Sequence, residues 1–203
     1  MVIRLAPKEK ELKINARAFG CKTFQDRTRA IIQEKNAMRY LSNFSDEQAI
    51  SLSELDLLRK IYSLINLQKA YSGHRIFYIN FDAKAWNNKF RNATVKPVMR
   101  ETLDKVFDTD IFSKTHDHYE AARIYIPDDF YELYWDGQLG GIEGLNQDTW
   151  MITYLGQIKY AFKGVCDSFH LLAKGDDLRA AVPIPVAISS STLPQDQPHP
   201  HPS

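Results

Sequence analysis

The run Gly175-Asp176-Asp177 constrains the local fold more than any other part of this chain. It lies between two short apolar runs, residues 169–173 and 178–182, and this pattern predicts a β-hairpin with an acidic turn. A tight turn that presents two carboxylates can hold Mg²⁺, because this ion prefers a few hard oxygen ligands. Glycine and aspartate are also common in ordinary turns, so the interpretation needs support from elsewhere in the chain.

Residues 76–81 predict a buried strand, because all of them except Asn80 are apolar or aromatic. Asp82 follows at the end of that strand. If the strand and the hairpin are neighbours in one sheet, Asp82 can share metal ions with Asp176. The alternative is that Asp82 is a strand-end cap and that Asp176 and Asp177 are plain turn residues.

A glycine-rich segment at residues 140–150 leads into a predicted helix. Apolar residues follow at helical spacing, at Met151, Leu155, Ile158, Phe162 and Val165. Gly140 and Gly141 would let the backbone approach a template or nucleotide without a clash at Cβ. The polar side chains of the segment can bind ribose, base or neighbouring backbone, or can cap the helix, and they are Glu143, Asn146 and Gln147.

These segments, in this order, resemble palm motifs A, B and C of the RNA-dependent RNA polymerase in the large protein of nonsegmented negative-strand RNA viruses. Asp-x-x-x-Trp-Asn-Asn at 82–88 is similar to motif A, and Gly-Gly-Ile-Glu-Gly-Leu-x-Gln-x-x-Trp at 140–150 to motif B. Ala-Lys-Gly-Asp-Asp at 173–177 is similar to motif C, where the family usually has asparagine in place of Asp177. The N-terminal segment 8–19 resembles the basic segment before motif A, so the resemblance covers roughly residues 3–182.

The resemblance implies nucleotidyl transfer, in which an RNA 3′-hydroxyl attacks the α-phosphorus of a nucleoside triphosphate such as ATP. It implies Mg²⁺ or Mn²⁺ as cofactor, with Asp82 and Asp176 as bridging ligands and Asp177 as a secondary ligand. It further implies template and nascent RNA, a phosphoprotein cofactor and nucleoprotein-coated RNA as partners, in the virion and the host cytoplasm, with the nucleus left open.

The resemblance also implies a set of nucleotide-binding residues. Lys10, Lys13 and Arg17 would face the negative triphosphate, although a solvated surface is the competing interpretation. Asn87 would contact the 2′-hydroxyl. The rest of the predicted nucleotide site comes from motif B and consists of Gly140, Gly141, Glu143 and Gln147. We leave Lys84 out, because it is expected to point away from the site.

The charge of the chain is unevenly distributed. Residues 1–39 contain ten lysines and arginines and four acidic residues, although the whole chain has a net charge of only +1. A basic N-terminal part beside an acidic metal site suits a phosphate-bearing partner. No apolar run approaches the ~18 residues of a membrane-spanning helix, so no membrane association is predicted.

The fold class implied is α+β, a partial right-hand polymerase with a palm of antiparallel strands backed by helices, helical finger elements and no thumb. Strands are expected at 75–81 and 122–126, the hairpin at 169–182, and helices at 46–71, 94–107 and 146–165. The fingers and palm would occupy residues 1–185. Residues 186–203 are rich in Ser, Pro and His and predict a disordered tail.

Two other hypotheses stay open. The first is that the chain is an inactive, endogenised or truncated copy of such a polymerase, since it ends soon after motif C. The second is an RNA-binding module, whose affinity would fall with salt and would not depend on Mg²⁺. Even for a polymerase fragment we expect little nucleotide incorporation in isolation, because a palm without its thumb would hold template and primer poorly.

Overall fold

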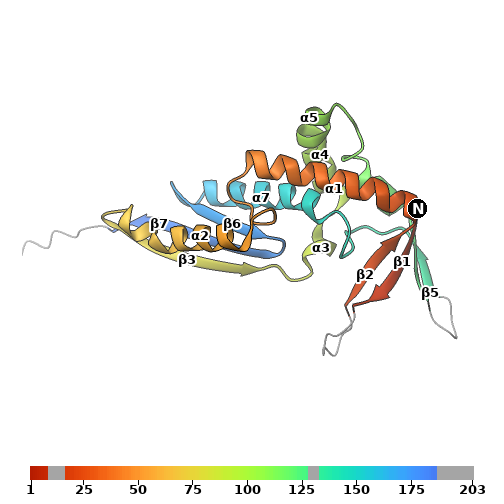
Figure 1. Cartoon of the computed structure of the whole chain (residues 1–203), viewed down its shortest axis with the longest axis horizontal. Coiled ribbons are helices and arrows are strands. Elements are labelled where there is room, and N and C mark those ends of the chain that lie inside the picture. The colour runs from red at the N-terminus through yellow and green to blue at the C-terminus, as the bar shows by residue number, and fades with distance from the viewer. Residues whose placement is uncertain (9–16, 128–132, 187–203) are drawn as a thin grey trace, which may run out of the picture.

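The computed structural model describes residues 1–8, 17–127 and 133–186, and it contains two sheets joined by helices (Figure 1). In the three-stranded antiparallel sheet, β7 (Asp177–Pro185) lies between β3 (His74–Asp82) and β6 (His170–Lys174). β3 and β7 pair along their whole length, from His74 opposite Pro185 to Asp82 opposite Asp177. The predicted strand and the predicted hairpin are both confirmed.

The second sheet has the order β2-β1-β4-β5. Its strands are β1 (Val2–Pro7), β2 (Ala18–Lys22), β4 (Arg123–Ile126) and β5 (Leu133–Asp136). β1 and β4 are parallel, and the other pairs are antiparallel. The short strand predicted near residue 124 is confirmed as β4. The sequence analysis did not predict that the basic N-terminal segment supplies two further strands.

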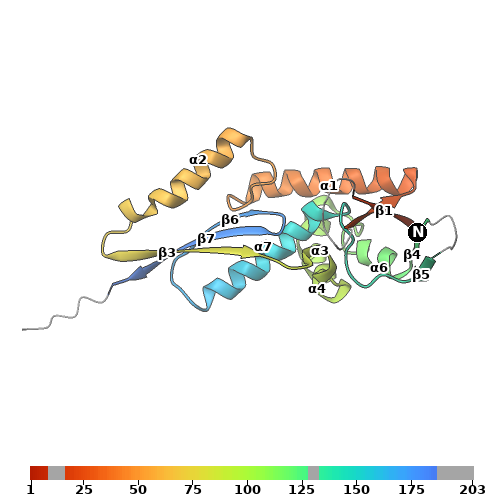
Figure 2. The ribbon, with the colours of Figure 1, turned by 90° about the horizontal axis from the view of Figure 1, so that it is seen from below.

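The helices are α1 (Phe24–Phe44), α2 (Glu54–Ile65), α3 (Trp86–Lys89), α4 (Asn92–Met99), α5 (Lys105–Phe107), α6 (Thr115–Glu120) and α7 (Gln147–Lys163), with a 3-10 turn at Asn66–Lys69 and a π-helical turn at Arg100–Asp104. The two sheets lie at opposite ends of an elongated molecule, and α1 and α7 pack against each other between them (Figure 2). The helices predicted at 94–107 and 146–165 are confirmed, whereas α1 was not predicted.

No helix within the described ranges is long and apolar enough to cross a membrane.

The helix expected from residue 46 begins only at residue 54. Ser53 caps it by accepting a hydrogen bond from the Asp56 backbone N–H at 3.2 Å. The preceding residues are held in an extended bridge to the edge of β6. The Ala49 N–H donates to the Ala173 carbonyl, and the Ala173 N–H donates to the Glu47 carbonyl, each at 2.8 Å. Backbone groups paired with a strand cannot form helical hydrogen bonds, so the predicted start was wrong.

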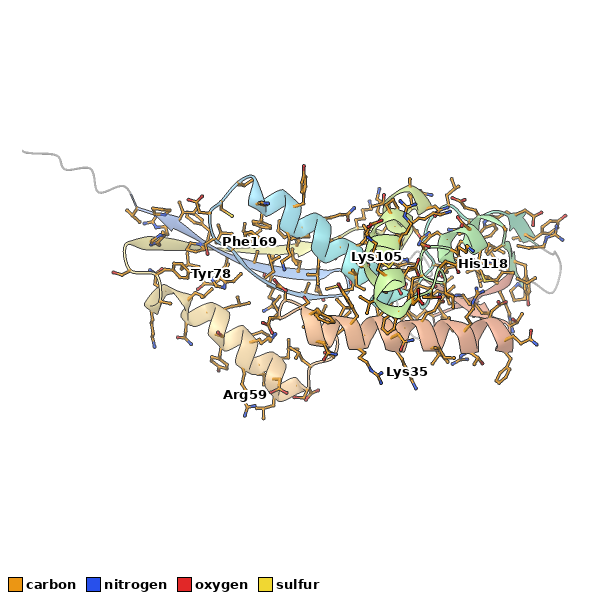
Figure 3. All side chains as sticks on the ribbon, turned by 90° about the horizontal axis from the view of Figure 1, so that it is seen from above. Lys35, Arg59, Tyr78, Lys105, His118 and Phe169 are labelled. Atoms are coloured by element: carbon orange, nitrogen blue, oxygen red, sulfur yellow. The ribbon has the colours of Figure 1, made fainter. Side chains whose placement is uncertain are left out.

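The apolar face that the sequence predicts to pack in this helix was wrong at three of its five positions. That face was Ile50, Leu55, Leu58, Ile61 and Ile65. Leu55, Leu58 and Ile65 are instead each more than half exposed. The helix contacts the sheet through its C-terminal end, where the Tyr78 hydroxyl donates to the carbonyls of Leu64 and Ile65. Figure 3 shows Tyr78 on the part of β3 beside α2.

β3 is less buried than its apolar sequence predicted. None of its residues is fully buried, and Phe77, Tyr78 and Phe81 are 46%, 50% and 41% exposed. The reason is its place in the sheet, because β3 is an edge strand and only β7 pairs with it among the described residues. The central strand β7 has the buried run that the sequence analysis assigned to β3.

The core lies where the first half of α7 meets α1, α3, α4 and α6. All residues from Thr149 to Leu155 are buried, and Trp150 is completely inaccessible. Phe90 stacks on Trp150 with ring centroids 5.4 Å apart, and Trp86 meets the edge of both rings. Trp86 and Trp150 therefore both act in core packing.

His116 is the polar partner of this aromatic core. It is 1% exposed, and its Nε2 accepts a hydrogen bond from Trp150 Nε1 at 3.0 Å. Burial lowers the pKa of His116 to about 4. The imidazole is therefore neutral at physiological pH, which the indole hydrogen bond requires.

We predict that His116 makes the fold sensitive to acid. Because its folded-state pKa lies below its ordinary value of 6.5, its contribution to stability is complete above pH 6.5 and is lost as pH falls toward 4. The loss should reach roughly 3 kcal/mol. Urea unfolding of wild type and His116→Gln, measured from pH 4 to pH 8, should show a steeper acid loss in wild type.

The acid loss of wild type must be compared with that of the variant, because Glu34 changes the stability in the opposite direction over an overlapping pH range. Its pKa is raised from 4.5 to about 7, so its contribution falls as pH rises through that interval. Equal acid losses in wild type and His116→Gln would contradict the role assigned to His116.

Candidate active site

Three carboxylates gather at one end of the three-stranded sheet. Asp82 is the last residue of β3 and lies directly opposite Asp177, the first residue of β7, so both project from the same face. Gly175 and Asp176 form a two-residue turn between β6 and β7. Gly175 has a φ of +64°, which a tight hairpin turn requires and glycine adopts without strain. The predicted proximity of strand and hairpin is confirmed.

A cleft of about 850 Å³ opens beside these carboxylates. Asp82 and Asp176 both line it, whereas Asp177 is not among the lining residues. Its walls bring together residues from both ends of the chain and from both sheets. The other polar side chains on the walls are Lys8, Arg17, Lys84, Asn87, Asn88, Gln138, Glu143 and Gln147.

The carboxylates are suited to a hard cation, although they do not form a closed cage. Within residues 1–8, 17–127 and 133–186, no group of three or more His, Cys, Asp or Glu side chains is placed to hold a metal ion. Mg²⁺ commonly keeps several waters and binds to one or two carboxylates together with substrate phosphates. Asp82 and Asp176, facing one open cleft, fit that kind of site.

The phenol of Tyr154 is affected by the charges of all three carboxylates. This residue lies on α7 and is 9% exposed. Burial raises the pKa of its phenol, and the negative charges of Asp176, Asp177 and Asp82 raise it further. The three carboxylates therefore act together on a single buried group, which places Asp177 in the same electrostatic environment as the two cleft residues.

Glu143 organises the basic side of the cleft. Its carboxylate accepts hydrogen bonds from Arg17 Nη2 at 2.9 Å and Arg17 Nε at 3.2 Å, and from Lys8 Nζ at 3.1 Å. The two cations come from the neighbouring strands β1 and β2 or their ends, so Glu143 ties the second sheet to the 140–150 segment. A bidentate arginine–carboxylate pair fixes orientation as well as charge.

Gly140 and Gly141 are required by packing inside the protein. A Cβ on Gly140 would lie 2.3 Å from the Asn88 carbonyl oxygen. A Cβ on Gly141 would lie 2.3 Å from the Trp150 ring and 2.8 Å from the Asn87 carbonyl oxygen. The glycines thus let the 140–150 segment pack directly on α3, a reason that the sequence analysis did not consider.

We predict that Gly141→Ala lowers the free energy of unfolding by about 1–3 kcal/mol, because the new methyl group overpacks against the buried Trp150 ring. Gly156→Ala is the matched control, since a Cβ there meets nothing within 4 Å and alanine favours the helix. Urea unfolding of both variants should show the two changes in opposite directions. A Gly141→Ala protein as stable as wild type would contradict this packing.

A largely buried polar cluster, none of whose members lines the cleft, also holds the segment. We call it the Glu34 network, and it consists of Lys22, Glu34, Tyr119, Asn146, Asp148 and Thr149. Burial raises the pKa of Glu34 to about 7 and that of Asp148 to about 6. Burial, reinforced by Arg29, lowers the pKa of Lys22 to about 8. The sequence analysis missed Glu34, which lies more than one hundred residues from its partners.

The remaining site predictions divide into three groups. Lys10 and Lys13 lie outside the described residues. Arg17, Asn87, Glu143 and Gln147 line the cleft with Asp82 and Asp176, and their roles there stay predictions. Lys84 also lines the cleft, so the expectation that it points away was wrong. The strand ends at Asp82, and the alternation of side chains does not continue to Lys84. Trp135 and Gln138 are further lining residues that were not predicted.

The fold resembles that of known telomerases. A telomerase structure from Candida tropicalis, truncated from its C-terminal domain, matches 89% of this chain and 43% of its own with a TM-score of 0.61 and 13% identity. A second C. tropicalis telomerase structure has a TM-score of 0.60 and 12% identity, over 89% of this chain and 39% of its own. At such low identity the likeness concerns the fold alone.

Sequence comparison identifies the family of this chain, which the likeness in fold does not. Residues 1–195 match the family described as Mononegavirales RNA dependent RNA polymerase, and the chain belongs to this family. Its relatives include the RNA-directed RNA polymerase L of European bat lyssavirus 1 and the large structural protein of rabies virus strain PM1503/AVO1. Each is 29% identical over 87% of this chain, which spans only 9% of the relative's length.

Proposed function

We propose that this chain contains the nucleotidyl-transfer site of a viral RNA-directed RNA polymerase, as one part of a large protein. The observation that supports this most is the cleft itself. The carboxylate at the end of β3, the carboxylate in the β6–β7 turn, an arginine–glutamate pair and the amide side chains of Asn87 and Gln147 all line one open space. This arrangement suits a triphosphate bound through a metal ion beside basic groups.

The carboxylates have distinct parts in this proposal. Asp82 and Asp176 hold Mg²⁺ or Mn²⁺ from two neighbouring elements, and Asp177 adds negative charge beside them. When bound, the ions would stabilise the attacking and leaving oxygens of the phosphoryl transfer. The three-stranded sheet would then be the palm, and the helices around it would include finger elements.

The remaining residues bind and orient the nucleotide. Arg17 and Lys8, held by Glu143, place positive charge where the triphosphate would lie, and Lys84, which also lines the cleft, adds to it. Lys10 and Lys13 are assigned the same part from their place in the basic segment. Asn87 is assigned to the ribose 2′-hydroxyl and Gln147 to ribose or base. Gly140 and Gly141 bring the chain close to Asp82.

The substrates in this proposal are nucleoside triphosphates, ATP included, with template and nascent RNA. A phosphoprotein and nucleoprotein-coated RNA would be partners of the whole large protein. Base pairing with the template selects each nucleotide, so the cleft needs contacts with phosphate and ribose more than with any one base.

We predict Mg²⁺-dependent binding of ATP that requires both cleft carboxylates. Fluorescent ATP titrated into the 203-residue chain should bind more weakly after Asp82→Asn or Asp176→Asn, by about tenfold or more, because a metal ligand is lost. Asp167→Asn is the control, since this acid is exposed and lies just beyond α7, away from the cleft.

Two results would overturn the proposal. One is binding of equal strength with and without Mg²⁺, and the other is binding unaffected by both substitutions. RNA binding that weakens with salt and ignores Mg²⁺, without any nucleotide site, would favour an RNA-binding module instead.

A further inference from the structure

The N-terminus of α7 lacks a cap of its own. Asn146 occupies the N-cap position with a left-handed backbone, φ +55° and ψ 29°, and makes no side-chain capping bond to the helix. This conformation is uncommon outside glycine, although asparagine adopts it more readily than most other residues. The first backbone N–H groups of a helix need acceptors, and at this helix end Asn146 and Thr149 are buried while Gln147 is exposed.

Glu34, on α1, supplies the missing acceptor from another helix. One carboxylate oxygen accepts the Asp148 backbone N–H at 2.7 Å. The other accepts the Thr149 hydroxyl at 2.6 Å and the Asn146 side-chain amide at 3.4 Å. A carboxylate at a helix N-terminus also interacts favourably with the helix dipole. The Glu34 side chain therefore binds three residues at the start of α7, which are Asn146, Asp148 and Thr149.

Asn146 is held from its other side as well. Its side-chain oxygen accepts hydrogen bonds from the Tyr119 hydroxyl, on α6, and from Lys22 Nζ at 3.3 Å, on β2. Asn146 is only 2% exposed, so its left-handed backbone is enclosed by these contacts. The left-handed conformation of Asn146 is therefore held by side chains from α1, α6 and β2, which are Glu34, Tyr119 and Lys22.

The residues on either side of Asn146 face the cleft. Gln147, the next residue, lines the cleft directly, and Glu143, three residues earlier, holds Lys8 and Arg17 there. A change in the backbone at Asn146 would move both. We propose that Glu34 is a positioning residue, which fixes the turn at Asn146 so that Glu143 and Gln147 are aligned for the nucleotide. This inference rests on the function proposed above.

Glu47 offers a matched comparison. It also lies beside α7 and is paired there, but with Lys159, far along the helix from the cleft. Its carboxylate is partly buried, like that of Glu34. Removing the charge of Glu47 should therefore cost some stability without disturbing the turn at Asn146.

The test compares Glu34→Ala, Glu34→Gln and Glu47→Gln in the 203-residue chain, with fluorescent ATP and Mg²⁺ as the probe. We expect Glu34→Ala to weaken ATP binding about tenfold, since it leaves a buried N–H unpaired and releases the turn. Glu34→Gln should restore most of the affinity, because glutamine keeps an acceptor for the Asp148 N–H and a donor for Thr149. Glu47→Gln should bind ATP like wild type.

Amide hydrogen exchange separates this inference from the proposed function. In Glu34→Ala, residues 140–150 should lose protection while the core of α7 keeps it, and Glu47→Gln should leave the segment unchanged. If wild type shows no Mg²⁺-dependent ATP binding, the proposed function fails, and the exchange result still decides whether Glu34 holds the turn.

Unchanged affinity together with unchanged protection in Glu34→Ala would overturn the inference. If that variant unfolds globally, Thr149→Val replaces it, because it removes one hydroxyl donor at constant size. The valine variant should reduce ATP affinity and the protection of residues 140–150, and wild-type values for both would again overturn the inference.

Discussion

The antiparallel pairing of β3 with β7 decides which side chains can meet at the cleft. The pairing ends with Asp82 opposite Asp177, and the hairpin turn places Asp176 immediately beyond that pair. A shift by a single residue would turn alternate side chains to the other face and separate the carboxylates. The 140–150 segment lies close to this pairing, since its glycines pack on Asn87 and Asn88 of α3, a few residues after Asp82.

The interior beneath this segment is polar, and its charges are strongly modified by burial. Glu34 and Asp148 have raised pKa values and Lys22 a lowered one, because each charged form loses contact with water. Such a cluster contributes little net stability compared with apolar packing. Its hydrogen bonds are directional, however, and they hold a backbone conformation that apolar contacts would not specify.

The sequence predicted those parts of the fold that have strong local signals. The hairpin has glycine in its turn, α7 has apolar residues at helical spacing, and the glycines at 140 and 141 stand out. By contrast, α1 buries Ala30, Gln33, Ala37 and Leu41, a stripe too weakly apolar to recognise. The start of α2 was missed because its preceding residues pair with a strand that lies far along the chain.

The same reasoning explains which site residues were found. Asp82, Asp176 and Glu143 belong to compact motifs whose spacing is visible in the sequence. Glu34 has no such signal, because its role depends on the packing of α1 against α7. Lys84 was excluded on the assumption that the strand continues beyond Asp82, and only the end of the pairing with β7 shows that it does not.

The two-residue turn at Gly175 and Asp176 also limits how this region can change during evolution. An inserted residue would lengthen the shortest type of hairpin loop and displace Asp176 from the end of the β3–β7 ladder. A deletion would remove the turn altogether. Side chains next to the turn can vary in size and polarity, but the number of residues between β6 and β7 cannot, so the length of the turn should be maintained as strictly as the identities of Gly175 and Asp176.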